Sequence, residues 1–275
     1  MQVAEVFDRA SGRLPMIPKV VQQLVSSLSH ADVINNDEIT RTVGHDQVLT
    51  ARVLRLANTP RFGGSRRVAS LEDALIILGF DNVRVLVIAS GVTGATAHIP
   101  DFDLKSFWQR CFEIANTARL LAQKTRKNPQ LAFTCGLLTR IGELVLHVAV
   151  PAKTNEIDKR VEAGESRIEA ERALLGVDSA QIGAELAWRW GFPELIINAL
   201  SRHYPLDHPG EVPELAVLIG LAKLLVDDFN HGLSNAEVLG RIPLVVLERL
   251  GMTETQLAEL LPDLKETSTA SDGMF

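Results

Sequence analysis

The chain contains one His-Asp dipeptide, His45–Asp46, and these residue types bind divalent metal ions in many proteins. Adjacent residues face different directions, so a metal site here needs a third ligand from elsewhere, and the sequence indicates none. Asp46 directly precedes the apolar-periodic segment 47–58, where a carboxylate can accept hydrogen bonds from the free N–H groups of a helix start. We therefore predict that Asp46 caps a helix, with metal binding as the alternative.

The elements that must position any site are all predicted to be helices. Nearly every segment has apolar residues at helical spacing, and the breaks between segments carry helix caps rather than hairpin signals. Asp103 is predicted to begin a long helix that ends near Lys124. Asn128–Pro129 is predicted to begin the next helix, which carries Thr139 and Arg140 in its middle and stops at Pro151. Further helix starts and stops are predicted at Ser166 with Glu169, Asp178 with Gln181, Ser234 with Glu237, Gly176 and Gly191.

Two breaks divide the chain. One lies near Ala97–Asp101 and the other within Asp207–Pro213, where proline and glycine are concentrated. We expect an N-terminal five-helix bundle over residues 13–98, a second helical half over 99–208 and a C-terminal helical extension over 209–265. The tail, residues 266–275, is polar, small and uncapped, which predicts disorder.

Composition indicates a cytoplasmic protein. The chain has 275 residues, a net charge of −6 and two cysteines, Cys111 and Cys135, both in apolar helical surroundings that favour core thiols over a disulfide. Its start lacks the apolar region of a secretory signal. The apolar run Leu215–Val226 is too short to span a membrane and is interrupted by Lys223, so no membrane span is expected.

Several segments together resemble the HDOD domain, a signalling module related to the HD-domain metal-dependent phosphohydrolases. The most specific pieces are the Leu-Pro-x-Ile-Pro opening at residues 14–18, Arg55–Asn58 and Ala74–Gly79. The remaining similar segments are residues 107–122, 131–146 and 174–204. By this resemblance residues 13–98 are the N-terminal half of an HDOD domain and 99–208 its HD-like half.

The resemblance implies that the metal ligands are largely lost. In metal-binding relatives, His and Asp side chains hold one or two divalent ions that polarise a phosphoryl oxygen and generate hydroxide. The former ligand positions in this chain are Arg110, Thr139, Arg140, Ser179, His203 and Tyr204. One imidazole without carboxylate partners is a poor metal site, and a guanidinium cannot become a ligand. No metal, no other cofactor and no catalytic residue is therefore expected.

Arg110 and Arg140 keep positive charge where a metal ion would sit. They could hold the nearby acids Glu113 and Glu143 in ion pairs, or they could bind an anionic ligand together with His203. Because His203 and Tyr204 end a helix, the simpler interpretation is a helix-terminal imidazole beside an aromatic ring packed on the surface.

Other positive or aromatic features favour structural roles. The arginine run, Arg52, Arg55, Arg61, Arg66 and Arg67, lies in an acidic chain with Phe62 as the one aromatic residue in its loop, so nucleic-acid binding is not expected. A solvated loop, or a contact for an acidic partner, fits it better. Trp188 and Trp190 are expected to pack in the core and at a helix end.

Three functions stay open. The favoured one is a non-catalytic output or scaffold module of bacterial signal transduction, acting through signalling protein partners and with a homodimer as one option. The second is a metal-dependent phosphohydrolase acting on a nucleotide or cyclic dinucleotide. The third is a sensor of a small anionic ligand.

Overall fold

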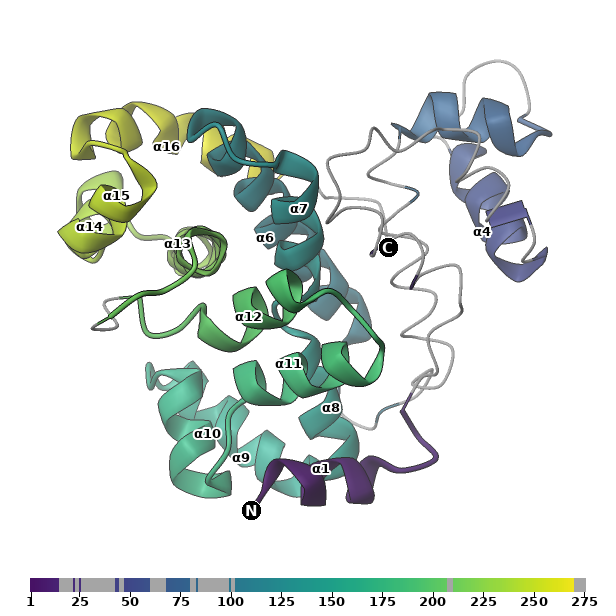
Figure 1. The fold of residues 1–275 in the computed structure, drawn as a ribbon, viewed down its shortest axis with the longest axis horizontal. Coiled ribbons are helices and arrows are strands. Elements are labelled where there is room, and N and C mark those ends of the chain that lie inside the picture. The colour runs from purple at the N-terminus through teal and green to yellow at the C-terminus, as the bar shows by residue number, and fades with distance from the viewer. Residues whose placement is uncertain are drawn as a thin grey trace. The chain divides into compact units, whose positions relative to one another are not determined.

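The protein is described here from a computed structural model that covers residues 1–14, 22, 25, 43–44, 47–59, 68–79, 83, 99, 102–206 and 210–269. All regular structure in these residues is helical, which confirms the predicted all-α fold (Figure 1). The labelled helices are α1 (Val3–Ala10), α4 (Gln47–Ala57), α6 (Leu104–Lys124), α7 (Pro129–Leu138), α8 (Ile141–Ala149), α9 (Pro151–Glu162), α10 (Arg167–Leu175), α11 (Ser179–Arg189), α12 (Glu194–Arg202), α13 (Glu214–Asn230), α14 (Asn235–Gly240), α15 (Leu244–Leu250) and α16 (Glu254–Thr269).

The chain divides into two compact units. One comprises residues 15–97 with 273–275, and the other comprises residues 1–14 with 98–272. In the first unit the Asn58 side chain joins the two ends of a loop, because its Nδ2 donates to the Val68 carbonyl at 2.8 Å and its Oδ1 accepts from the Val68 N–H at 2.9 Å. Asn58 closes the Arg-Leu-Ala-Asn segment, so this motif residue has a structural role. His45–Asp46 and Arg61, Arg66 and Arg67 lie outside the described residues.

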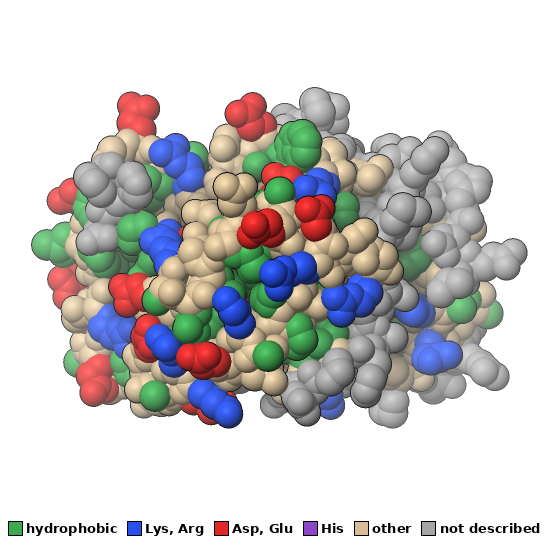
Figure 2. Space-filling view, turned by 90° about the horizontal axis from the view of Figure 1, so that it is seen from below, with side chains coloured by type: hydrophobic (Ala, Val, Ile, Leu, Met, Phe, Trp, Pro, Cys, Tyr) green, Lys and Arg blue, Asp and Glu red, His purple; other side chains and the backbone are tan. Residues whose placement is uncertain are grey.

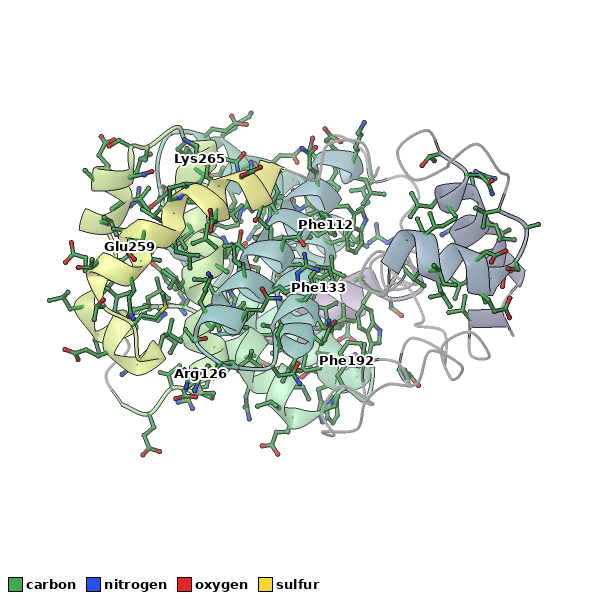
Figure 3. All side chains as sticks on the ribbon, turned by 90° about the horizontal axis from the view of Figure 1, so that it is seen from above. Phe112, Arg126, Phe133, Phe192, Glu259 and Lys265 are labelled. Carbon is green, nitrogen blue, oxygen red and sulfur yellow. The ribbon has the colours of Figure 1, made fainter. Side chains whose placement is uncertain are left out.

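The larger unit is built around α6, which packs on α7, α13 and α16. Phe112 of α6 meets Phe133 of α7 edge to face, with ring centroids 6.0 Å apart (Figure 3). Cys111 and Cys135 are both buried free thiols in these two helices, as predicted. Burial of so many aromatic and aliphatic side chains supplies most of the favourable free energy of folding.

The predicted caps that rest on local hydrogen bonds are confirmed. Asp103 accepts from the Ser106 N–H, Asn128 accepts from two backbone amides of α7, and Asp178 accepts from the Gln181 N–H. Ser234 and Glu237 form the reciprocal capping box. Ser166 is an exception, because it precedes α10 without capping it by its side chain and its Oγ lies 3.3 Å from the Tyr204 hydroxyl instead.

Helix α1 was not predicted, although Val6, Phe7 and Ala10 show its helical spacing and are buried. It packs on α8 and α11, and the Arg189 guanidinium lies 4.1 Å from the centroid of the Phe7 ring. The prediction of a disordered tail from residue 266 was too early. Residues 266–269 continue α16, because buried Leu264 and Leu261 anchor its last turns.

The helix predicted to run from Asn128 to Pro151 is two helices. Thr139 and Arg140 lie between them, as the C-cap of α7 and the N-cap of α8, and not in the middle of one helix. The break lets α7 pack on α6 while α8 packs on α11. Gly142 allows the second contact, because a Cβ added there would lie 1.9 Å from the Ser179 carbonyl oxygen.

The stretch Pro129–Ala149 that holds this break is long and apolar enough to cross a membrane by length and composition. Within the protein, however, 94% of its apolar window is buried, as in a core helix. It is the one such stretch in the described part of the chain.

Candidate functional site

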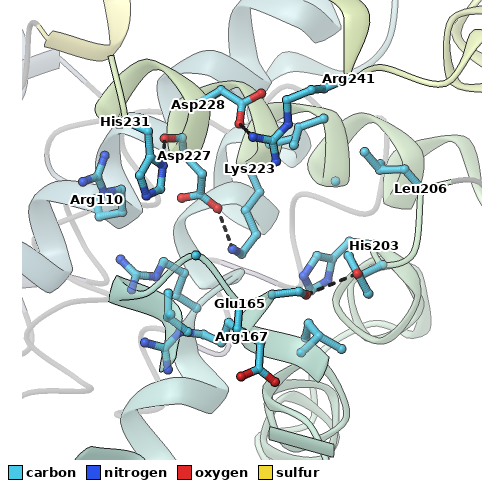
Figure 4. A pocket seen from close by; sticks show the side chains of 18 of the residues that line it. Arg110, Glu165, Arg167, His203, Leu206, Lys223, Asp227, Asp228, His231 and Arg241 are labelled. Atoms are coloured by element: carbon cyan, nitrogen blue, oxygen red, sulfur yellow. Dashed lines mark hydrogen bonds and ion pairs between the residues drawn. The ribbon is translucent and has the colours of Figure 1, made fainter. Parts of the chain in front are cut away.

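A cavity of about 590 Å³ opens within the larger unit, where α6, the α7–α8 junction, the turn between α9 and α10, the end of α12, and α13 meet (Figure 4). Four of the six former ligand positions line it. They are Arg110, Arg140, His203 and Tyr204. The fold therefore brings together residues that lie up to 94 positions apart in the sequence.

Arg140 and Glu143 form a largely buried ion pair on this wall. The Arg140 Nη2 donates to Glu143 Oε2 at 2.7 Å, and the Nε is 3.1 Å from both carboxylate oxygens, which is the fork geometry of a strong pair. Burial alone would raise the pKa of Glu143, but the charges of Arg140 and Arg167 outweigh it and hold that pKa well below its usual range. The predicted ion pair of Arg140 with Glu143 is confirmed.

Arg167, the first residue of α10, ties three carboxylates together. Its guanidinium is 3.5 Å from Glu143 Oε2, pairs with Asp158 and lies 3.7 Å from Glu171 Oε1. Asp158 also accepts from His147 Nε2, whose Nδ1 lies 2.8 Å from the Glu143 carbonyl. The turn between α9 and α10 is thus joined to α8 by ionic contacts.

Glu171 differs from Glu143 although both are buried. Burial, together with the negative charge of Glu143, raises the pKa of Glu171 to about 7. Its Oε2 accepts from the Ser179 N–H at 2.6 Å, while its Oε1 has no hydrogen-bond partner. This carboxyl is therefore partly protonated near neutral pH.

On α6, Arg110 forms an ion pair with a glutamate three residues later, as Arg140 does with Glu143. Its Nη1 donates to Glu113 Oε2 at 3.1 Å, which confirms the second predicted ion pair. Asn230 of α13 donates to the same carboxylate oxygen at 3.1 Å. Burial and then the like charge of Arg140 lower the pKa of Arg110, although Glu113 acts in the opposite direction.

His203 is buried at the C-cap of α12, which confirms the expected helix-terminal imidazole, and Tyr204 beside it is partly exposed. It follows α12, and its Nδ1–H donates to the Leu200 carbonyl at 2.8 Å. Burial, with a smaller contribution from the Lys223 charge, lowers the pKa of His203 to about 4. The imidazole is therefore neutral at physiological pH.

Thr139 and Ser179 do not line the cavity. The Thr139 hydroxyl donates to the Cys135 carbonyl at 2.8 Å, and Ser179 begins α11 beside Gly142. Both are buried and serve helix packing.

Sequence reasoning missed several charged residues that line the cavity: Glu165, Arg167, Lys223, Asp227, Asp228, His231 and Arg241. The Lys223 Nζ donates to Asp227 at 2.9 Å, and Arg241 lies 3.2 Å from Asp228. The sequence did contain a signal for Lys223, because the ammonium group of a lysine in an otherwise apolar helix needs a polar partner or contact with solvent. Arg167 and Arg241 carried no comparable local signal.

The model of the HDOD domain family matches residues 14–206. This chain belongs to the HDOD family. The expected resemblance is therefore confirmed.

Solved structures and a curated protein are similar to most of this chain. A solved candidate phosphohydrolase from Shewanella amazonensis SB2B is 31% identical, with 98% of each chain covered and a TM-score of 0.72. A solved candidate signal transduction protein from Marinobacter aquaeolei VT8 is 25% identical with a TM-score of 0.80, over 95% of this chain and 59% of that chain. An uncharacterised protein of Treponema pallidum (strain Nichols) is 27% identical over 235 residues, 81% of this chain and 44% of the relative. The chain thus spans less than half of the length of that curated relative.

The donor set of this HDOD cavity does not fit a hydrolytic metal centre. Two of the four former ligand positions that line it, Arg110 and Arg140, carry guanidinium groups, and the Glu143 carboxylate is already paired with Arg140 and Arg167. Within the described residues, no group of three or more His, Cys, Asp or Glu side chains is placed to hold a metal ion. Positive charge from Arg110, Arg140 and Lys223 would also repel a dication.

Two further residues were predicted to be structural. Trp190 is buried and meets Phe192 at 5.7 Å between ring centroids, as expected. Trp188 is 64% exposed, so the prediction of core packing was wrong for it. Residues two apart on a helix point about 200° away from each other, so both indoles cannot face the core.

On the face seen in Figure 2, basic and acidic side chains of the described residues are interspersed.

Proposed function

We propose that this HDOD protein is a non-catalytic module of bacterial signal transduction that acts in the cytoplasm through contacts with signalling protein partners. The observation that carries the proposal is the pair of arginine–glutamate ion pairs, Arg110 with Glu113 and Arg140 with Glu143, whose arginines stand where the resemblance to metal-binding relatives implies ligands. An internal ion pair satisfies the charges that a metal would otherwise bridge, and it supplies no activated water.

The relatives support a module that works as part of larger assemblies. The Marinobacter relative is a candidate signal transduction protein, and both it and the Treponema relative extend well beyond the region matched here. A domain found within longer chains commonly passes a change of state to its neighbours through its surface. A second copy of this chain is one partner to consider.

A second candidate function is phosphohydrolysis, favoured by the 31% identical Shewanella relative, a candidate phosphohydrolase. The two proposals differ in a simple assay. Protein incubated with manganese, iron, zinc or nickel and then desalted is expected to release no phosphate or nitrophenolate from nucleotides and aryl phosphodiesters. Metal-dependent turnover that survives a change of purification and is lost in Glu143→Gln would favour the hydrolase.

Partner contact is tested separately. Cross-linking of the tagged protein in cells, followed by mass spectrometry of linked peptides, is expected to connect it to signalling proteins through defined surfaces. Light scattering of the purified protein tests the homodimer. A strictly monomeric protein with no reproducible cross-linked partner would contradict a scaffold role.

A further inference from the structure

The cavity presents hydrogen-bond donors that its internal ion pairs leave unused. Lys223 has three N–H donors and gives one to Asp227, and Arg140 uses its Nε and Nη2 on Glu143 while its Nη1 has no hydrogen bond to a described residue. In the view of Figure 4, Lys223 reaches into the cavity with Arg110 on one side of it and His203 on the other. The wall therefore offers spare cationic donors in place of spare ligands for a metal.

These cations come from different helices and act on one another. Arg110 belongs to α6, Arg140 precedes α8, Arg167 begins α10 and Lys223 lies in α13. Like charges held close together raise the free energy of the empty cavity, and an anion placed among them lowers it. Four separate elements thus contribute cations to the wall of one cavity.

The acids of the wall limit which anion can bind. Glu143 is 3% exposed and Asp228 is 1% exposed, and each is already paired with an arginine, Arg140 and Arg241 respectively. Asp227 and Glu165, by contrast, are each 37% exposed. Exposed carboxylates would repel a polyphosphate but accept hydrogen bonds from amino or hydroxyl groups.

The rest of the wall suits the organic part of a ligand. Its apolar side chains are Val161, Ile168, Leu206, Leu224 and Leu233, and Tyr204 adds an aromatic ring with its hydroxyl near Ser166. A volume of about 590 Å³ is typical of pockets that enclose a small molecule, which commonly measure about 300–1,000 Å³.

We propose that this cavity binds a small organic phosphate monoester of nucleoside monophosphate size, without hydrolysing it. The guanidinium groups of Arg110 and Arg140 and the Lys223 ammonium hold the phosphate, while Asp227 and Glu165 accept hydrogen bonds from the organic part. The inference rests on the proposed function, because it makes the ligand an input to a signalling module. Occupancy would be felt at the turn between α9 and α10, whose residues 161–168 line the cavity and whose Arg167 contacts Glu143.

Isothermal titration with AMP and GMP as probes tests the proposal, with adenosine and inorganic phosphate as partial ligands. We expect AMP or GMP to bind more tightly than inorganic phosphate, and adenosine to bind at least about tenfold more weakly than AMP. Lys223→Met and Arg110→Met are expected to weaken nucleotide binding by at least about tenfold each. Added sodium chloride should weaken binding as well, since partly exposed charges are screened.

Two control variants each remove one positive charge at a position outside the cavity. Lys153→Met and Lys159→Met lie on α9 outside the cavity wall and should bind as the wild type does. If Lys223→Met or Arg110→Met unfolds, Arg110→Lys keeps the charge and loses the fork, and it should weaken binding severalfold.

Absence of binding by all the probes up to about 10 mM would overturn the proposal, as would equal binding by cavity and control variants. Phosphate release and metal content are measured in the same samples. Release of phosphate from AMP with retained metal would contradict the non-catalytic function while leaving the site in place. Failure to bind would leave the non-catalytic function untouched.

Discussion

Replacing Arg140 by methionine tests the buried ion pair of Arg140 with Glu143 in this cavity. The change leaves Glu143, which is 3% exposed, with only Arg167 at 3.5 Å as a described cationic partner. Removing one partner of a buried pair costs about 3–5 kcal/mol, and the remaining Arg167 contact should reduce this to about 2–3 kcal/mol. Methionine keeps apolar contact with Phe107, whose ring centroid lies 5.5 Å from the Arg140 guanidinium carbon.

The assay is thermal unfolding followed by circular dichroism. For a unit of this size, a loss of 2–3 kcal/mol corresponds to a fall in Tm of about 4–12 °C. Arg160→Met is the matched control, because the Arg160–Glu156 pair has a similar N–O distance of 3.1 Å but is 39% and 53% exposed. It should change the free energy of unfolding by less than about 1 kcal/mol. The double variant Arg140→Met with Glu143→Met should recover part of the loss.

The loss of stability in Arg140→Met should depend on pH. Because Arg140 and Arg167 hold the pKa of Glu143 below its usual range, the stability that this carboxylate contributes is present above its unfolded pKa and is lost as pH falls. In Arg140→Met the carboxylate is poorly compensated, so protonation relieves it and the deficit relative to wild type shrinks in acid. A deficit below about 1 kcal/mol that does not change between about pH 7.5 and pH 4.5 would refute this reasoning.

Two other substitutions test the packing around this site. Glu171→Gln should stabilise the protein by up to about 3 kcal/mol at pH 8 and by less than about 1 kcal/mol at pH 5. The reason is that the pKa of Glu171 is raised to about 7 in the folded protein, so the wild type loses stability as the pH rises above the pKa of this carboxyl in the unfolded chain. Thermal melts that show the same difference at both pH values would contradict this. Gly142→Ala should lower the free energy of unfolding by about 3 kcal/mol or more, since its Cβ would lie 1.9 Å from the Ser179 carbonyl oxygen. The control is Gly240→Ala, whose Cβ would have no atom within 4 Å and which should be neutral or slightly stabilising. Equal melting temperatures of the two variants would show that α8 and α11 can move apart.

Much of the fold was predictable because its signals are local. A helix cap needs only a short polar side chain a few positions from the amide it accepts from, as for Asp103 and Asn128. The pairs of Arg110 with Glu113 and Arg140 with Glu143 are also local, since residues three apart lie on one face of a helical turn.

The rest of the site depends on tertiary structure. Lys223 and Arg167 reach the cavity because α13 and α10 meet there, and no spacing within either helix reports that contact. The break at Thr139 was missed for a different reason. When a segment is buried on all sides, its apolar residues show no periodic face, so a change of helix direction leaves no mark on the pattern.

The metal content of the purified protein tests the central claim most directly. Protein without an affinity tag is prepared without chelator, incubated with manganese, iron, zinc or nickel, desalted and measured by inductively coupled plasma mass spectrometry. The internal ion pairs of Arg110 and Arg140 predict well below one metal ion per chain under every condition. Near-stoichiometric metal that is lost on Glu143→Gln would contradict the account and favour the phosphohydrolase function.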